Sequence, residues 1–545
     1  MLAVMFLVAL VFFIVCYKFY GGFLSRKFNL DNSRQTPAEC LYDGMDYCPT
    51  HPAVLMGHHF SSIAGAGPIV GPITAAAWFG WFPAYIWCLV GSAFFGGPHD
   101  MGSLVASIRH DGKSMGEVVR RWIGEKGRIL FLCFTILTLF LIVAVFLHLA
   151  SATMAGDPAV AFSATVYMAM AIAFGLMTYR FNISLKVATL VMLPIVFGSC
   201  WFAHSSETIK AAFTLSYGTW RWLMIGYVVI ASILPVWLLL QPRDYLASYF
   251  LYFAVLIGGI GMIFGSGFEV TMPAFKGGFS VTDAAGNEQY IWPLLFITVA
   301  CGAISGFHSM VGSGTSSKQL RNESDSVVVG YGAMLLEGLV AVIALGTIMI
   351  ASEIKGPMNP IAIYASGFGK FGALVGIDPV LGASLGALAI NSFILTTVDT
   401  ATRLTRYQIQ EFTGGRVDMF SATAIAVAGS LSFLFIQTGG KPFHTVIWPV
   451  FGAANQLVAA LALLGVAVWV RKALNKNVTF LMGPMWFMLI TTIAAICFLV
   501  RDQLRAAEPS YLIISVCAVL AVLAILMLLE SMKALKDVGS VQPGD

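Results

Sequence analysis

Charged residues are scarce in this chain. Only 11% of its 545 residues are Asp, Glu, Lys or Arg, whereas 58% are hydrophobic; soluble proteins carry about 25% charged residues. A soluble fold would have to bury this apolar content in cores that stop growing beyond about 250–300 residues. The formal net charge of +4 is too small to indicate a polyanionic partner. The composition excludes a soluble, nucleic-acid-binding or disordered protein and predicts one that crosses a membrane many times.

Sequence patterns of nucleotide-binding, catalytic and disulfide-linked proteins are also missing. No Gly-x-x-x-x-Gly-Lys-[Ser/Thr] segment occurs, which excludes direct coupling to ATP within this chain. His-Glu-x-x-His is absent, as is any other convincing catalytic constellation, so we expect neither an enzyme nor a cofactor. Seven of the nine cysteines lie in apolar stretches, which argues against a disulfide framework. Cys40, Cys48 and His51 are too few ligands for tetrahedral zinc, so we expect no metal site.

Long apolar runs predict an all-α polytopic membrane protein. Each run has about 20 residues, enough for a helix to cross about 30 Å of hydrocarbon. We expect fifteen such helices, at residues 2–17, 54–79, 81–107, 129–151, 159–179, 185–204, 222–240, 247–264, 292–313, 327–351, 383–400, 419–437, 447–470, 480–499 and 510–531. The segments between them reach only about 30–36 residues. The sequence therefore predicts a single transmembrane domain over residues 1–545 and no soluble domain.

The distribution of basic residues predicts the orientation of these helices. Residues 108–128 form the most basic loop, which we place in the cytoplasm. Alternating crossings then put 23 of the 31 Lys and Arg residues inside and 8 outside, with the N-terminus out and the C-terminus in. Residues 2–15 have no preceding basic residue and no following cleavage site, so we expect an uncleaved anchor.

Two of the predicted helices contain a repeated, glycine-rich segment. Residues 60–68 and 307–315 share a Phe, a Ser and both glycines at an offset of 247. Because glycine adopts strained dihedrals at little cost, we expect non-helical breaks near mid-membrane at Gly65, Gly67, Gly312 and Gly314. Paired broken helices in two halves of a chain are typical of secondary transporters. The topology gives the two segments opposite directions, which predicts inverted repeats.

Ionisable and polar residues within the apolar runs are the candidates for function, because charge in hydrocarbon is costly. We expect the substrate site to lie at the breaks and to be formed by His58, His59, Ser62, Gly65, Gly67, His308, Ser309, Gly312, Gly314, Asn455 and Gln456. Asp100 and Glu337 are candidates for proton coupling, since a histidine or a shifted carboxylate can exchange a proton near neutral pH. The alternative is that these groups only hold helices together by hydrogen bonds. The two amides, Asn455 and Gln456, suit either role.

A second group of charges is predicted at the inner membrane surface. Asp399 and Arg403 share one helix face at i,i+4 spacing, and Arg243 and Asp244 approach the same surface. We expect these four residues to form a gate that closes the cytoplasmic exit. The alternative is an ordinary ion pair at a helix end, with arginines that snorkel to water.

Several of these segments carry a resemblance to a known family. The sequence closely resembles the carbon-starvation protein (CstA) family of membrane transporters in residues 43–50, 57–68, 235–246, 300–308, 397–403 and 448–456. The resemblance implies a bacterial or archaeal cytoplasmic membrane. It also implies inverted five-helix repeats like those of amino acid–polyamine–organocation carriers.

The resemblance also implies a function. We expect a secondary active transporter that imports short peptides or pyruvate-like carboxylates during carbon starvation. Coupling to protons is the expected driving force, and no nucleic-acid partner is expected. The alternative is a channel or nutrient sensor that keeps a transporter fold.

Overall fold

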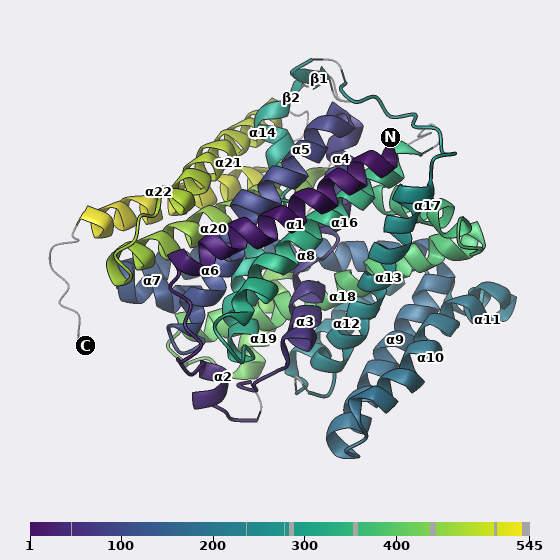
Figure 1. Cartoon of the computed structure of the whole chain (residues 1–545), viewed down its shortest axis with the longest axis horizontal. Helices are drawn as coiled ribbons and strands as arrows, with labels where there is room; N and C mark the ends of the chain where they lie inside the picture. The colour runs from purple at the N-terminus through teal and green to yellow at the C-terminus, as the bar shows by residue number, and fades with distance from the viewer. Residues whose placement is uncertain are drawn as a thin grey trace.

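The protein is almost entirely helical (Figure 1). The computed structural model describes residues 1–44, 46–235, 237–276, 278–282, 288–351, 358–435, 443–505 and 509–536, with the backbone alone at 443–447. Within these residues the only strands are β1, Ser280–Thr282, and β2, Glu288–Tyr290, which pair antiparallel as one hairpin. The expected all-α class is confirmed.

The helices follow the apolar runs of the sequence. Those of the first half are α1 (Leu2–Lys27), α2 (Pro37–Cys40), α3 (Pro52–Ile63), α4 (Gly67–Phe79), α5 (Trp81–Gly91), α6 (Gly97–Ile108), α7 (Met115–Ile123), α8 (Glu125–Gly156), α9 (Pro158–Gly175), α10 (Leu185–Ser205), α11 (Glu207–Phe213), α12 (Tyr217–Ile233) and α13 (Leu240–Phe264). Those of the second half are α14 (Ile291–Thr298), α15 (Gly306–Gly314), α16 (Ala333–Met349), α17 (Pro360–Ala373), α18 (Pro379–Phe412), α19 (Met419–Leu434), α20 (Phe443–Ala473), α21 (Thr479–Arg505) and α22 (Tyr511–Lys536). Figure 1 shows α9 and α10 side by side at one edge of the bundle and α20, α21 and α22 at another.

Among the described residues, ten helices are long and apolar enough to cross a membrane, or eleven spans if α3 and α4 count as one broken span. A multi-pass membrane protein is therefore confirmed. The other predicted crossings contain shorter helices: α5 with α6, α12, α14 with α15, and α19. The full number of fifteen crossings stays a prediction.

Short polar side chains fix the starts of several helices. A side-chain oxygen accepts a hydrogen bond from a first-turn N–H group in α7, α9, α12, α18 and α19, where the capping residues are Ser114, Asp157, Ser216, Asp378 and Asp418. These N–H groups have no partner within the helix, so the caps specify where the chain leaves a loop.

Three loops meet at one end of the bundle. Arg109 pairs with Glu323 and donates a hydrogen bond to the Asn29 carbonyl (2.9 Å). The Tyr47 hydroxyl donates to the Asp111 carbonyl at 2.9 Å. We call this end, formed by residues 28–51, 109–114 and 315–326, the first-loop face. Its three loops are those that alternating crossings predict on one side of the membrane.

Both segments predicted to be broken do contain a break. Residues 64–66 separate α3 from α4 with a bend of 46°, and residues 299–305 separate α14 from α15. Gly67 at the start of α4 packs against Cys301, and Gly71 packs against the Thr298 carbonyl. From Gly67 to Gly71 the residue number in α4 rises, whereas that of the contacted residue falls from Cys301 to Thr298. The two broken segments therefore lie beside each other and run antiparallel.

The position of the second break differs from the prediction. Gly312 and Gly314 are helical residues of α15, and the break lies upstream of them. Gly67 is already the first residue of α4, so of the four glycines only Gly65 lies within a break. None of the four has a positive φ. Three of them serve close packing instead: besides Gly67, a Cβ at Gly314 would lie 2.5 Å from Leu404, and one at Gly65 would lie 2.8 Å from Phe146.

Candidate functional site

Two amides of α20 satisfy the backbone groups that the second break leaves free. Asn455 Oδ1 accepts a hydrogen bond from the Phe307 N–H group at 2.9 Å, in the first turn of α15. Its Nδ2 donates to the Ser305 hydroxyl at 2.9 Å. Gln456 Nε2 donates to the Phe296 carbonyl near the end of α14. Non-helical backbone at membrane depth requires such partners, so both amides hold helices together in this structure.

A buried cluster of two carboxylates and two imidazoles lies beside this break. Asp100 on α6 lies 2.6 Å from His99 Nδ1 and 2.8 Å from His308 Nδ1. Nε2 of His308, on α15, lies 3.3 Å from Glu337 on α16. All four side chains are at most 1% exposed. The structure thus brings Asp100, His308 and Glu337, which the sequence singled out separately, into one group.

The elements that carry this cluster have an irregular winding. A π-helical turn, Ser92–Gly96, precedes α6, and another, Val327–Gly332, precedes α16. Each π-helical turn contains one residue more than an α-helical turn, which rotates the side chain of Asp100 or Glu337 to a different face of its helix. Such turns are frequent at functional sites. The first of these turns coincides with the segment Phe94-Phe95-Gly96-Gly97-Pro98, directly before His99.

The cluster has no permanent positive charge. Among the described residues, neither Asp100 nor Glu337 pairs with a Lys or Arg, and neither oxygen of Glu337 accepts a hydrogen bond. Uncompensated carboxylates at this depth are costly. Protons on these side chains can balance the charge of the group, because carboxylates and imidazoles take up and release protons.

A second buried cluster surrounds Arg243. Its guanidinium lies 2.7 Å from Asp244 on the same helix, α13, and forms an ion pair with Asp399 of α18. Tyr227 of α12 donates a hydrogen bond to Asp399 at 2.6 Å. His58 Nδ1, on α3, lies 3.0 Å from Asp244 Oδ2.

This arrangement corrects the predicted pairing of the gate residues. Arg243, Asp244 and Asp399 are at most 1% exposed, so all three side chains are buried among the helices. Asp399 pairs with Arg243 and not with Arg403. Arg403 instead donates to the carbonyls of Ala231 (3.1 Å) and Leu234 (2.6 Å), at the end of α12. The last carbonyls of a helix lack partners within it and attract a cation, which outweighs the i,i+4 spacing.

Three other candidate residues use their polar atoms inside the protein. His59 Nδ1 lies 2.7 Å from the Ser316 hydroxyl, and both residues are buried. Ser62 donates to the His58 carbonyl at 2.9 Å, and Ser309 donates to the Gly306 carbonyl at 2.7 Å. None of these three residues lines the pocket described next.

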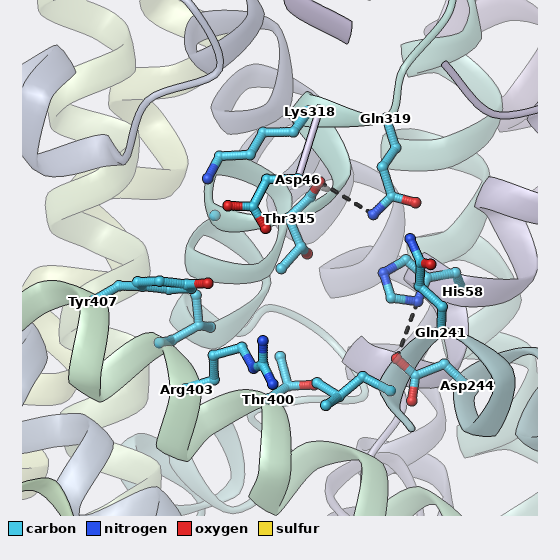
Figure 2. Close-up of a pocket in the computed structure, with 13 residues that line it drawn as sticks. Asp46, His58, Gln241, Asp244, Thr315, Lys318, Gln319, Thr400, Arg403 and Tyr407 are labelled. Carbon is cyan, nitrogen blue, oxygen red and sulfur yellow. Dashed lines mark hydrogen bonds and ion pairs between the residues drawn. The ribbon is translucent and has the colours of Figure 1, made fainter. Parts of the chain in front are cut away.

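A pocket opens from the second cluster towards the first-loop face (Figure 2). We call it the inner pocket; it is lined by Asp46, His58, Leu240, Gln241, Asp244, Gly314, Thr315, Lys318, Gln319, Thr400, Arg403, Leu404 and Tyr407. His58, Asp244, Gly314 and Arg403 were candidates from the sequence. Lys318 and Tyr407 were not, although Lys318 follows Gly314 by one helical turn and Tyr407 follows Arg403 at i,i+4 spacing.

Sequence comparison identifies the family. The chain matches the family described as carbon starvation protein CstA over residues 1–368 and 351–495. The chain belongs to the carbon starvation protein CstA family. Its similarity to the peptide transporter CstA of Bacillus subtilis is 33% identity, covering 90% of this chain and 89% of that one. With the pyruvate/proton symporter BtsT of Escherichia coli K12 it shares 31% identity, over 88% and 79% of the two chains.

Solved structures include more distant neighbours. A crystal structure of a manganese transporter mutant from Eremococcus coleocola aligns over 91% of this chain and 99% of that one, with a TM-score of 0.46 and 12% identity. The named relatives of this CstA-family chain are transporters. The chain is therefore a membrane transporter and not an enzyme.

Proposed function

We propose that the protein is a secondary active transporter that imports pyruvate-like carboxylates or short peptides, driven by protons, in the response to carbon starvation. The names of the two relatives, a peptide transporter and a pyruvate/proton symporter, support both substrate classes. We place it in a bacterial or archaeal cytoplasmic membrane with the N-terminus outside and the C-terminus inside. The first-loop face is then cytoplasmic.

The observation that carries proton coupling is the buried group of Asp100, His308 and Glu337. Its members come from α6, α15 and α16, and the described residues provide it with no Lys or Arg partner. His308 lies two residues from the start of α15, so it is placed next to the break. A proton bound here changes the charge beside a backbone that can rearrange. That is the physical requirement for coupling a proton to a conformational change.

The antiparallel broken segments support alternating access. We infer fifteen crossings that include inverted five-helix repeats, with α3–α4 in one repeat and α14–α15 in the other. The substrate path would lead from the two breaks into the inner pocket. The ion pair between Arg243 and Asp399 would act as the gate between them, because it joins α13 to α18 at the inner end of that path.

Transport by the purified protein in proteoliposomes tests this function. Labelled pyruvate and alanyl-alanine would be offered under separate proton and sodium gradients. We expect accumulation above equilibrium under the proton gradient, saturation with substrate, and loss of accumulation on adding a protonophore. An internal substrate concentration that never exceeds the external one would instead indicate a channel. Accumulation under the sodium gradient alone would refute proton coupling.

A further inference from the structure

Arg403 reaches the inner pocket with an uncompensated charge. The residue is 6% exposed, and two backbone carbonyls fix its guanidinium. It forms no ion pair with any described residue, and its Nε has no hydrogen-bond partner. Asp399, one helical turn before it, is already paired with Arg243. A buried cation without a paired anion is costly, so this position favours the binding of an anion.

Lys318 brings a second cation to the same pocket. Its ammonium lies 5.4 Å from the ring centre of Tyr47 and 5.8 Å from that of Tyr407. Contacts of a cation with aromatic rings position the ammonium but do not neutralise it. Within the described part of the chain, Lys318 also forms no ion pair. Figure 2 shows Lys318 and Arg403 on two sides of the pocket, with the Tyr407 hydroxyl directed into the space between them.

The pocket contains two carboxylates, and they differ in their partners. Asp244 lies 2.7 Å from Arg243 and 3.0 Å from His58. Asp46, on the half-buried part of the first loop, forms no ion pair with any described residue. It lies in the same pocket as the two unpaired cations and belongs to a loop rather than to a helix.

We propose that Arg403 and Lys318 form a binding site for the carboxylate of a transported substrate at the first-loop face, and that Asp46 competes for this site. This site rests on the proposed function and deepens it. Two cations and a hydroxyl suit a monocarboxylate such as pyruvate or the C-terminus of a dipeptide. The Asp46 carboxylate lies in the same pocket without pairing with either cation, so it is the group with which a substrate carboxylate would compete.

Binding to the detergent-solubilised full chain tests the site without requiring transport. Pyruvate and alanyl-alanine would be titrated, and Kd obtained from the ligand-induced rise in Tm. We expect Lys318→Gln to weaken binding about tenfold, which corresponds to about 1.4 kcal/mol. Asp46→Asn should tighten it several-fold, because the competing carboxylate is gone. Ethyl pyruvate and alanyl-alanine methyl ester, which lack the carboxylate, should not compete.

Matched variants separate this site from general charge effects and from misfolding. Lys113 does not line the inner pocket; it lines a neighbouring hollow that Lys318 and Tyr407 also border. Lys113→Gln should therefore leave Kd unchanged if the carboxylate binds between Lys318 and Arg403. Lys318→Arg should keep most of the affinity, which excludes a loss caused by unfolding. The site would be overturned by equal Kd values in wild type, Lys318→Gln and Asp46→Asn, by equal binding of the esters, or by no binding to wild type.

The two proposals fail separately. Accumulation of pyruvate by wild type together with unchanged Kd values in the variants would overturn the site and leave transport supported. Carboxylate binding that responds to Lys318→Gln and Asp46→Asn as expected, in a protein that never accumulates substrate, would support the site and overturn the proposed function.

Discussion

Arg243 of α13 and Asp399 of α18 form an ion pair in which both side chains are fully buried. The Tyr227 hydroxyl donates to the same carboxylate at 2.6 Å, which adds α12 to the contact. Three helices are thus joined at one carboxylate. Because the pair is desolvated, removing either partner leaves a charge without compensation.

Asp399→Asn should therefore destabilise the protein strongly. We expect a loss of about 3–5 kcal/mol, the usual cost of breaking a buried pair, measured by denaturant unfolding in detergent. Glu207→Gln removes an exposed partner of Lys210 and should have little effect. An unfolding free energy of Asp399→Asn close to that of wild type would show that the pair contributes no net stability.

A charge swap distinguishes a gate from a purely structural pair. Arg243→Asp combined with Asp399→Arg keeps opposite charges on α13 and α18, so it should recover part of the stability lost in Asp399→Asn. If the pair also closes the path, Asp399→Asn should raise cysteine labelling of the inner pocket from the cytoplasmic side. Labelling equal to that of wild type would place the gate elsewhere.

Sequence reasoning identified the charged residues of this network but not their pairing. Local spacing placed Asp399 and Arg403 on one helix face, whereas the partner of Asp399 is 156 residues away in the chain. Arg403 is drawn to the end of α12, a tertiary contact that no local pattern contains. The same limitation hid Lys318 and Tyr407, whose importance arises only where α15, α18 and the first loop meet.

For the broken helices, the sequence likewise predicted part of the structure correctly and part of it wrongly. The glycine-rich repeat correctly indicated that both segments are interrupted. It gave the wrong place for the second break, because glycine was read as a residue that permits strain. In the structure Gly67 and Gly314 permit contact with Cys301 and Leu404, and the break lies where Asn455 and Gln456 supply hydrogen bonds.

Asn455→Ala should weaken the second break. The Phe307 N–H group and the Ser305 hydroxyl would each lose a buried partner, at a cost of about 1–3 kcal/mol per unsatisfied group. Asn477 makes comparable bonds to Thr479 on the surface. Asn477→Ala should cost about 1 kcal/mol or less, because water replaces the amide. Equal losses of unfolding free energy in the two variants would contradict the role of Asn455.

Gly67→Ala should disturb the contact between the two broken segments. The added Cβ would meet both Cβ and Sγ of Cys301, and overpacking of this kind costs about 1–3 kcal/mol. Cys301→Gly removes the opposing atoms. The double variant should thus be more stable than the sum of the single effects predicts, as measured by a double-mutant cycle. Strict additivity would show that the segments do not press on each other here.

The strongest test of proton coupling is the replacement of Glu337 by Gln. The amide keeps the size of the side chain but holds no exchangeable charge, so the proton gradient should no longer drive accumulation. Exchange of labelled for unlabelled substrate needs no net proton movement and should persist. Asp100→Asn should behave in the same way, because Asp100 and Glu337 contact the two nitrogens of His308. Glu269→Gln changes an exposed carboxylate and serves as the control.

Loss of both accumulation and exchange would indicate damage to binding or folding. Proton-driven uptake that survives replacement of Glu337, Asp100, His58 and His59 in turn would refute the assignment of the proton to any of them.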